Sequence, residues 1–71
     1  MKRAELIRLM SLGARDADVP WEFVREGSGH EIWSLAGRLV PIPRHREISD
    51  ETAVAILGKL EGRLGKRWWC R

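Results

Sequence analysis

The sequence predicts an α+β fold, a two-layer sandwich in which two helices cover one face of a three-stranded antiparallel sheet. Three observations predict it. Apolar residues recur at helical spacing near each end of the chain, and the middle holds three short strand-like stretches. Turns that contain glycine separate those stretches. Each helix carries one apolar stripe, so both helices can pack on the same face and leave the other face open.

The first helix is expected over residues 2–12. Its apolar stripe consists of Leu6, Ile7, Leu9 and Met10. Glu5 lies in the first turn, where the helix dipole favours a negative charge, and Gly13 is read as the C-terminal stop. Residues 14–20 are expected to form a solvated loop. They contain three turn-forming residues: Asp16, Asp18 and Pro20. Two aspartates alone are too few for a metal site.

Three strands are expected next, at residues 21–26, 30–35 and 38–42. Regular alternation places Trp21 and Phe23 on one face of the first strand. In the second strand it separates two sets of side chains: Glu31, Trp33 and Leu35 on one face, and His30, Ile32 and Ser34 on the other. Pro41 cannot donate a ladder hydrogen bond, so the third strand should lie at an edge of the sheet.

A charged loop leads into the second helix, which Ser49 or Asp50 is expected to cap. Its stripe comprises Ala53, Ile56, Leu57, Leu60 and Leu64. Gly65 ends this helix or starts a tail that contains Trp68 and Trp69 between cations. These tryptophans can stack on bases, dock on the protein's own core or dock on a partner. The two docking interpretations are favoured, because large aromatic side chains usually become buried.

Length and charge limit the function. A chain of 71 residues is expected to form one domain of marginal stability. Association with a partner or with further copies of the chain would add stability. The net charge is +3, and arginine supplies most of the basic residues, so nucleic acid is a candidate ligand. Cys70 is the only cysteine, which excludes an internal disulfide and favours the cytoplasm. No membrane span, signal peptide, Walker loop or zinc-ligand spacing is recognisable.

The stretch Gly27-Ser28-Gly29-His30 combines features that suit phosphate chemistry. Glycines allow positive φ angles and close approach to a ligand, and the amides of such turns bind phosphate oxygens. His30 can gain or lose a proton near neutral pH, as an acid or base must. An ordinary hairpin with a surface histidine has the same residues, so this alternative stays open. A Ser28–His30 nucleophilic pair is disfavoured, because residues two apart around a tight turn seldom align.

Cleavage of RNA fits this inventory, because RNA carries its own nucleophile, the 2′-hydroxyl group. The protein must then supply an acid/base, for which His30 is the candidate, and groups that bind the phosphate. This chemistry requires no metal and no cofactor. Eight further residues are candidates for contacts with RNA or phosphate: Arg25, Gly27, Ser28, Gly29, Arg38, Arg44, His45 and Arg46. Of these, His45 is either a second acid/base or only a cation in a loop.

Several blocks resemble, in the same order, the HicA-type toxins of bacterial and archaeal toxin–antitoxin modules. Residues 1–10 resemble the family's opening helix, and residues 25–33, Arg-Glu-Gly-Ser-Gly-His-Glu-Ile-Trp, resemble its Gly-Ser-(x)-His signature. Residues 40–48 resemble its proline- and histidine-containing segment, and residues 52–60 its second helix. The chain departs from the pattern in the Gly29 spacer, in a longer loop after the first helix, and in a tail without counterpart.

The resemblance implies a double-stranded-RNA-binding-domain-like α-β-β-β-α fold, with an RNA-cleaving domain at residues 1–64 and a tail at 65–71. It implies an mRNA interferase, the toxin of a type II system, which stops translation by cleaving mRNA. It also implies a HicB-type antitoxin protein that covers the active site. The family's catalytic histidine corresponds to His30, and its glycine and serine correspond to Gly27 and Ser28. His45 matches a second recurrent histidine.

Two other functions remain open at this point. A non-catalytic module on the same fold would bind RNA or DNA through its arginines, with salt-sensitive affinity and no need for His30. A small interaction protein would instead use Trp68 and Trp69 to dock a partner, without binding nucleic acid. Loss of RNA cleavage on substitution of His30 distinguishes the toxin from both.

Overall fold

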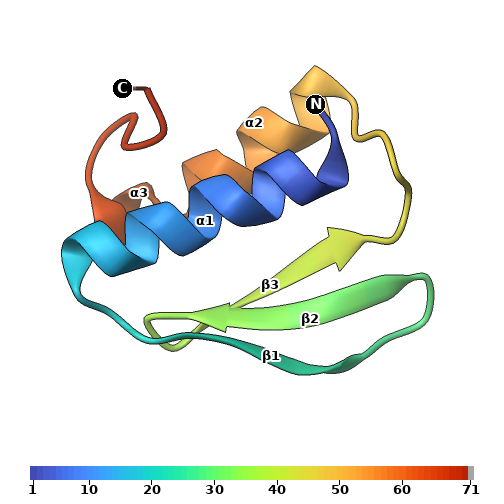
Figure 1. Ribbon diagram of the computed structural model, residues 1–71, viewed down its shortest axis with the longest axis horizontal. Coiled ribbons are helices and arrows are strands. Elements are labelled where there is room, and N and C mark those ends of the chain that lie inside the picture. Colours follow the sequence, from blue (N-terminus) through green and yellow to red (C-terminus); the bar gives the residue numbers. More distant parts are fainter. Residues whose placement is uncertain (71) are drawn as a thin grey trace.

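The expected helix and strand order is present in the computed structural model, which describes residues 1–70 (Figure 1). Arg71, the last residue of the tail, lies outside the described residues. The elements are α1 Arg3–Ala17, β1 Trp21–Glu26, β2 His30–Leu35, β3 Arg38–Pro43, α2 Asp50–Lys59 and α3 Glu61–Leu64. The helices form one layer and the sheet forms the other, so the α+β two-layer prediction is confirmed.

The sheet has the strand order β1-β2-β3, and both neighbouring pairs are antiparallel. β3 is therefore an edge strand, as Pro41 predicts. The β1–β2 register shifts between Phe23 and Arg25, where a bulge interrupts the alternation. Phe23 pairs with Trp33, whereas Arg25 pairs with Ile32, so the bulge turns Arg25 to the opposite face from Phe23. Regular alternation along β1 would have kept both on one face.

The core lies between the helices and the half of the sheet formed by β2 and β3. Its largest fully buried side chains are Leu6, Met10, Leu35, Val40, Ile42, Leu57 and Leu60. None of them comes from β1, where every residue except the half-buried Trp21 is exposed. Trp21 and Phe23 pack on Trp33 of β2. The ring centroid of Trp33 lies 4.6 Å from that of Trp21 and 5.6 Å from that of Phe23. β1 therefore extends the sheet beyond the part that the helices cover.

α1 is longer than the sequence predicts, since it continues through Gly13 to Ala17. The prediction of a stop at Gly13, followed by a loop from residue 14, is wrong. The helix ends at Asp18, which adopts a left-handed conformation with φ 55° and ψ 49°. Gly13 has a different purpose: a Cβ atom there would lie 2.5 Å from Cζ3 of Trp68, too close for any side chain. Glycine at this position lets the tail approach the helix.

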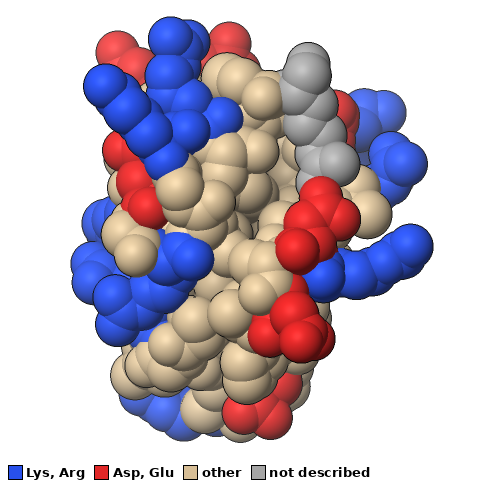
Figure 2. Space-filling view, turned by 90° about the vertical axis from the view of Figure 1, so that its left-hand side faces the viewer, with Lys and Arg blue, Asp and Glu red and all other residues tan. Residues whose placement is uncertain are grey.

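The tail folds back on the protein's own core. The Trp68 indole Nε1 donates to the Leu57 carbonyl at 3.0 Å, and Trp69 packs edge-on against Trp68. Of the three uses considered for these tryptophans, docking on the own core is confirmed for Trp68 and Trp69. Figure 2 faces this end of the molecule and shows an uncharged band through its middle, with charged side chains of both signs on either side.

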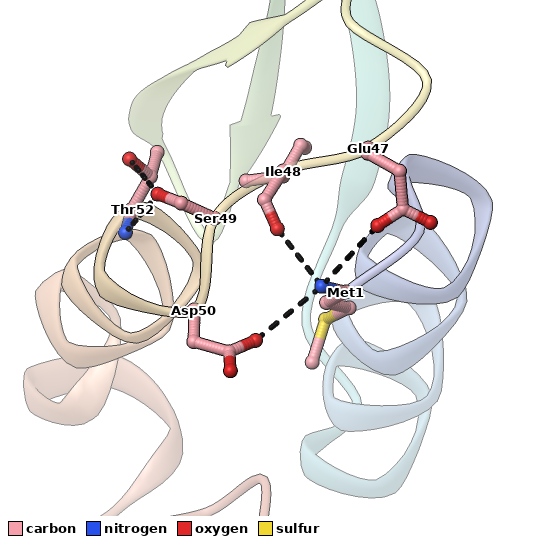
Figure 3. Close-up of polar contacts among 6 residues, drawn as sticks. All are labelled: Met1, Glu47, Ile48, Ser49, Asp50 and Thr52. Atoms are coloured by element: carbon pink, nitrogen blue, oxygen red, sulfur yellow. Dashed lines mark hydrogen bonds and ion pairs between the residues drawn. The ribbon is translucent and has the colours of Figure 1, made fainter.

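The second predicted helix is interrupted. Ser49 caps α2 as expected, because its Oγ accepts from the Thr52 amide at 3.2 Å (Figure 3). However, α2 ends at Lys59, and residues 61–64 form the separate short helix α3. The Leu57 carbonyl accepts from the Leu60 amide at 3.1 Å and from the Trp68 indole. This tightened turn redirects the chain, so the prediction of one helix through Leu64 is wrong.

The first residue is tied to the segment that precedes α2 (Figure 3). The Met1 ammonium group donates to the Ile48 carbonyl at 2.8 Å, and the Ile48 amide donates to the Met1 carbonyl at 2.8 Å. The same ammonium group lies 3.4 Å from the Asp50 carboxylate and 3.8 Å from that of Glu47. These contacts join the starts of α1 and α2.

Within residues 1–70, no helix is long and apolar enough to cross a membrane.

Candidate functional site

The β1–β2 turn that carries the Gly-Ser-Gly-His stretch is fixed by a short-range hydrogen bond and by the backbone conformation of one glycine. The Gly27 amide donates to the His30 carbonyl at 2.7 Å, so it is engaged within the turn instead of free for a phosphate oxygen. Gly29 has φ 72°, a left-handed conformation that glycine adopts without steric cost. Ser28 and Gly29 are exposed. The turn therefore presents His30 at the start of β2 on a short, well-defined loop.

His30 projects from the face of β2 opposite to the one that α1 contacts. Its neighbour Glu31 points to the helix layer, where the Arg3 guanidinium of α1 pairs with it, and alternate residues of a strand face opposite sides. The imidazole is exposed, and its Nδ1 lies 3.0 Å from the Ser28 carbonyl oxygen. A carbonyl oxygen only accepts, so this contact requires the hydrogen on Nδ1. In the neutral ring, Nε2 then keeps the lone pair that can accept a proton.

A pocket of about 360 Å³ lies beside His30, between β3 and α2. Its walls are His30, Pro41, Pro43, Glu51, Thr52, Ala55, Ile56 and Lys59. Lys59, a cation that was not among the residues predicted from the sequence, lines the same pocket as His30. Helical spacing does place Thr52, Ile56 and Lys59 on one face of α2. Only the packing of α2 beside β3 reveals that this face borders His30.

The predicted cations do not all gather at His30. Arg38 pairs with Leu35 at the far end of β3, whereas Pro43 pairs with His30. Five residue steps separate Arg38 from Pro43, or about 17 Å along the strand. Arg25 lies on the open face of the sheet beside Ile32, turned there by the bulge. Of these two candidates, only Arg25 shares both the hairpin and the face of His30.

The remaining candidates follow β3. Arg44 is closest to the hairpin, because its amide donates to the Gly29 carbonyl at 3.4 Å and its guanidinium pairs with Glu26. His45 and Arg46 are exposed in the loop beyond it. Arg46 lines a second pocket, at the start of α1. The structure therefore brings Arg44 to the hairpin, and Arg44 also lines the basic pocket that contains Arg46.

Arg3 holds the two strands of the site in place from the helix layer. Its Nε donates to the Pro43 carbonyl at 2.9 Å while its guanidinium also binds the Glu31 carboxylate. The Trp33 indole donates to the same carboxylate at 3.2 Å. The hydrogen bond from Arg3, and after it that from Trp33, holds the pKa of Glu31 below its ordinary value. Arg3 thus locks the paired strand ends that carry His30 and Pro43.

Comparison with protein-family models, curated proteins and solved structures finds no match to this chain. The candidate site is therefore defined by its own geometry: an exposed histidine on a glycine hairpin, a neighbouring pocket that contains Lys59, and an arginine at the strand end.

Proposed function

We propose that this protein is a small RNA-cleaving toxin of the HicA type, with a double-stranded-RNA-binding-domain-like fold. The observation that carries the proposal is the presentation of His30. The imidazole is exposed on the open side of the sheet, and the contact between Nδ1 and the Ser28 carbonyl leaves Nε2 as the basic nitrogen. The resemblance of the Gly-Ser-Gly-His hairpin to the HicA signature supports the same assignment.

In the proposed reaction, Nε2 of His30 takes the proton of a ribose 2′-hydroxyl group. The O2′–P bond forms as the P–O5′ bond breaks, and a proton from water or a second acid reaches the leaving 5′-oxygen. The products are a 2′,3′-cyclic phosphate and a 5′-hydroxyl end. The Ser28 carbonyl stabilises the imidazolium through its contact with Nδ1, and Lys59 stabilises the charge on the phosphate. A HicB-type antitoxin would neutralise the toxin by covering the hairpin.

The decisive experiment compares the wild type with His30→Ala. Both proteins are induced in a bacterial host while growth and mRNA integrity are followed, and both are purified and incubated with a labelled RNA. We expect arrest and cleavage with the wild type only, and products with cyclic phosphate ends. Since His30 is exposed, the circular dichroism spectrum should not change. Full cleavage by His30→Ala would contradict the proposal.

Lys59→Ala should slow cleavage, with exposed Lys66→Ala as its matched control.

A non-catalytic nucleic-acid-binding module is the second candidate, and the basic pocket at the start of α1 favours it. Growth arrest by both wild type and His30→Ala, with intact RNA, would establish this alternative. The interaction protein that docks partners through its tail is less well supported, because Trp68 already packs on the core and donates to Leu57.

A further inference from the structure

A second pocket lies where the start of α1 meets the loop after β3, and its lining is almost entirely cationic. It measures about 430 Å³ and is lined by Lys2, Arg3, Ala4, Arg44 and Arg46. We propose that it binds a phosphodiester group of single-stranded RNA that flanks the bond cleaved at His30. The inference rests on the proposed function and adds to it the residues that hold the RNA backbone.

Backbone contacts bring these cations together from two distant parts of the chain. The Arg3 amide donates to the Arg46 carbonyl at 2.9 Å, and Lys2 forms an isolated antiparallel bridge with Glu47. The segment before α1 and the segment after β3 therefore run side by side as a two-stranded ribbon. Because the ribbon is held by main-chain hydrogen bonds, the pocket exists before any anion binds, which lowers the entropic cost of binding.

The charges of the pocket are only partly compensated. Arg3 pairs with Glu31, and Arg44 pairs with Glu26. Among residues 1–70, the side chains of Lys2 and Arg46 have no carboxylate partner, and both are exposed. Two residues with uncompensated positive charges therefore line the pocket, next to the positive end of the α1 dipole. This arrangement attracts an anion.

The position of the pocket favours RNA over other anions. Arg44 directly follows Pro43, the residue that pairs with His30, and its amide contacts the Gly29 carbonyl. The pocket thus continues from the strand end that carries the candidate catalytic site, so one nucleic-acid chain can occupy both. Guanidinium groups also match the geometry of phosphate oxygens better than ammonium groups do. Two of its lining residues, Lys2 and Arg3, come from a segment to which the sequence analysis assigned no ligand.

The test measures binding of a labelled 12-nucleotide single-stranded RNA in the His30→Ala background, so that cleavage does not interfere. Lys2→Ala/Arg46→Ala is compared with Arg15→Ala/Arg63→Ala, which removes the same charge from exposed positions. Arg15 lies thirteen residues along α1 from Lys2, or about 20 Å. We expect the first pair to weaken binding at least tenfold. For Lys2→Ala/Arg46→Ala, the slope of log affinity against log salt concentration should be shallower than for the control pair by about 1.4. Each phosphate contact to a single strand contributes about 0.7 to this slope, and the variant removes two cations.

Equal affinities and equal salt slopes for the two double variants would overturn the inference. Loss of affinity for a poly-glutamate peptide, without loss for the RNA, would also overturn it and assign the pocket to an acidic protein surface.

This measurement of binding is independent of the proposed catalysis. If wild-type protein does not cut RNA but the Lys2/Arg46 variant binds it poorly, only the cleavage proposal fails. If the wild type cuts and the variant binds normally, only this inference fails.

Discussion

At the scale of single residues, the neighbours His30 and Glu31 project from opposite faces of the sheet. His30 is exposed on the open face, while Glu31 receives hydrogen bonds from Arg3 and Trp33 on the helix face. Alternation along β2 predicts this division from the sequence. Alternation does not predict the face on which Arg25 lies, because that face depends on the bulge. Nor does it predict that Lys59 lines the same pocket as His30, because that depends on how α2 packs.

The Glu31 contacts predict a specific pH dependence of stability. The pKa of Glu31 is lowered in the folded state, against about 4.3 in an unfolded chain. Its ionised form therefore stabilises the fold above that value, and this contribution is lost as the pH falls through the lowered pKa. The urea midpoint of Glu31→Gln should lie below that of the wild type near neutral pH, and the gap should shrink below about pH 4.3.

Glu22→Gln is the control for this measurement. Glu22 is exposed, and among residues 1–70 it belongs to no ion pair, so its variant should follow the wild-type pH profile. A gap between wild type and Glu31→Gln that stays constant from pH 7 to pH 3 would show that the carboxylate charge contributes nothing. The substitution would then act through packing alone.

At the scale of elements, the strands were more predictable than the helix ends. Glycine-containing turns and alternation locate β1 and β2 from local sequence alone, and the structure has both as expected. Gly13 could not be interpreted locally, because a helix stop and a site of close packing both select glycine. The deciding partner is Trp68, 55 positions later in the chain. The end of α2 was missed for the same reason, since the Leu57 carbonyl also binds that indole.

Two glycine-to-alanine substitutions in helices should therefore have opposite effects. Gly13→Ala places a Cβ 2.5 Å from Trp68 Cζ3, so we expect a loss of about 1–3 kcal/mol in the free energy of unfolding. Gly58→Ala, in α2, meets no atom within 4 Å and should gain up to about 1 kcal/mol from helix propensity. Urea unfolding measures both. A stabilising effect of Gly13→Ala would contradict the packing of the tail against α1.

At the scale of the whole molecule, the helices and the tail bury one part of the sheet and leave another part bare. The core lies under β2 and β3, whereas Phe23 and Val24 of β1 are 46% and 44% exposed. The layer arrangement follows from the sequence, because each predicted helix has one apolar stripe. The pocket beside His30 and the basic pocket at the start of α1 do not follow from the sequence, because each is assembled from segments that only the tertiary fold brings together.

Removal of residues 65–71 tests how far the tail belongs to the folded unit. The truncated chain loses the hydrogen bond from Trp68 to Leu57 and the packing of both tail tryptophans on the core. We expect it to fold, with a free energy of unfolding lower by about 2–3 kcal/mol, somewhat less than for a fully buried aromatic side chain. RNA cleavage should persist at temperatures where it is folded. Unchanged stability would show that the tail only rests on the surface.

The paired packing of the tryptophans also gives this protein its own optical labels. The chain has four tryptophans and no tyrosine, so its absorbance near 280 nm comes almost wholly from indole. Trp21 and Trp33 are stacked at 4.6 Å with an angle of 16°, whereas Trp68 and Trp69 meet at 84°. Each pair keeps this one ring geometry, and so one fixed coupling of its electronic transitions, only while its own part of the molecule is folded. Separation of the sheet and release of the tail can therefore be followed spectroscopically, without an added fluorophore.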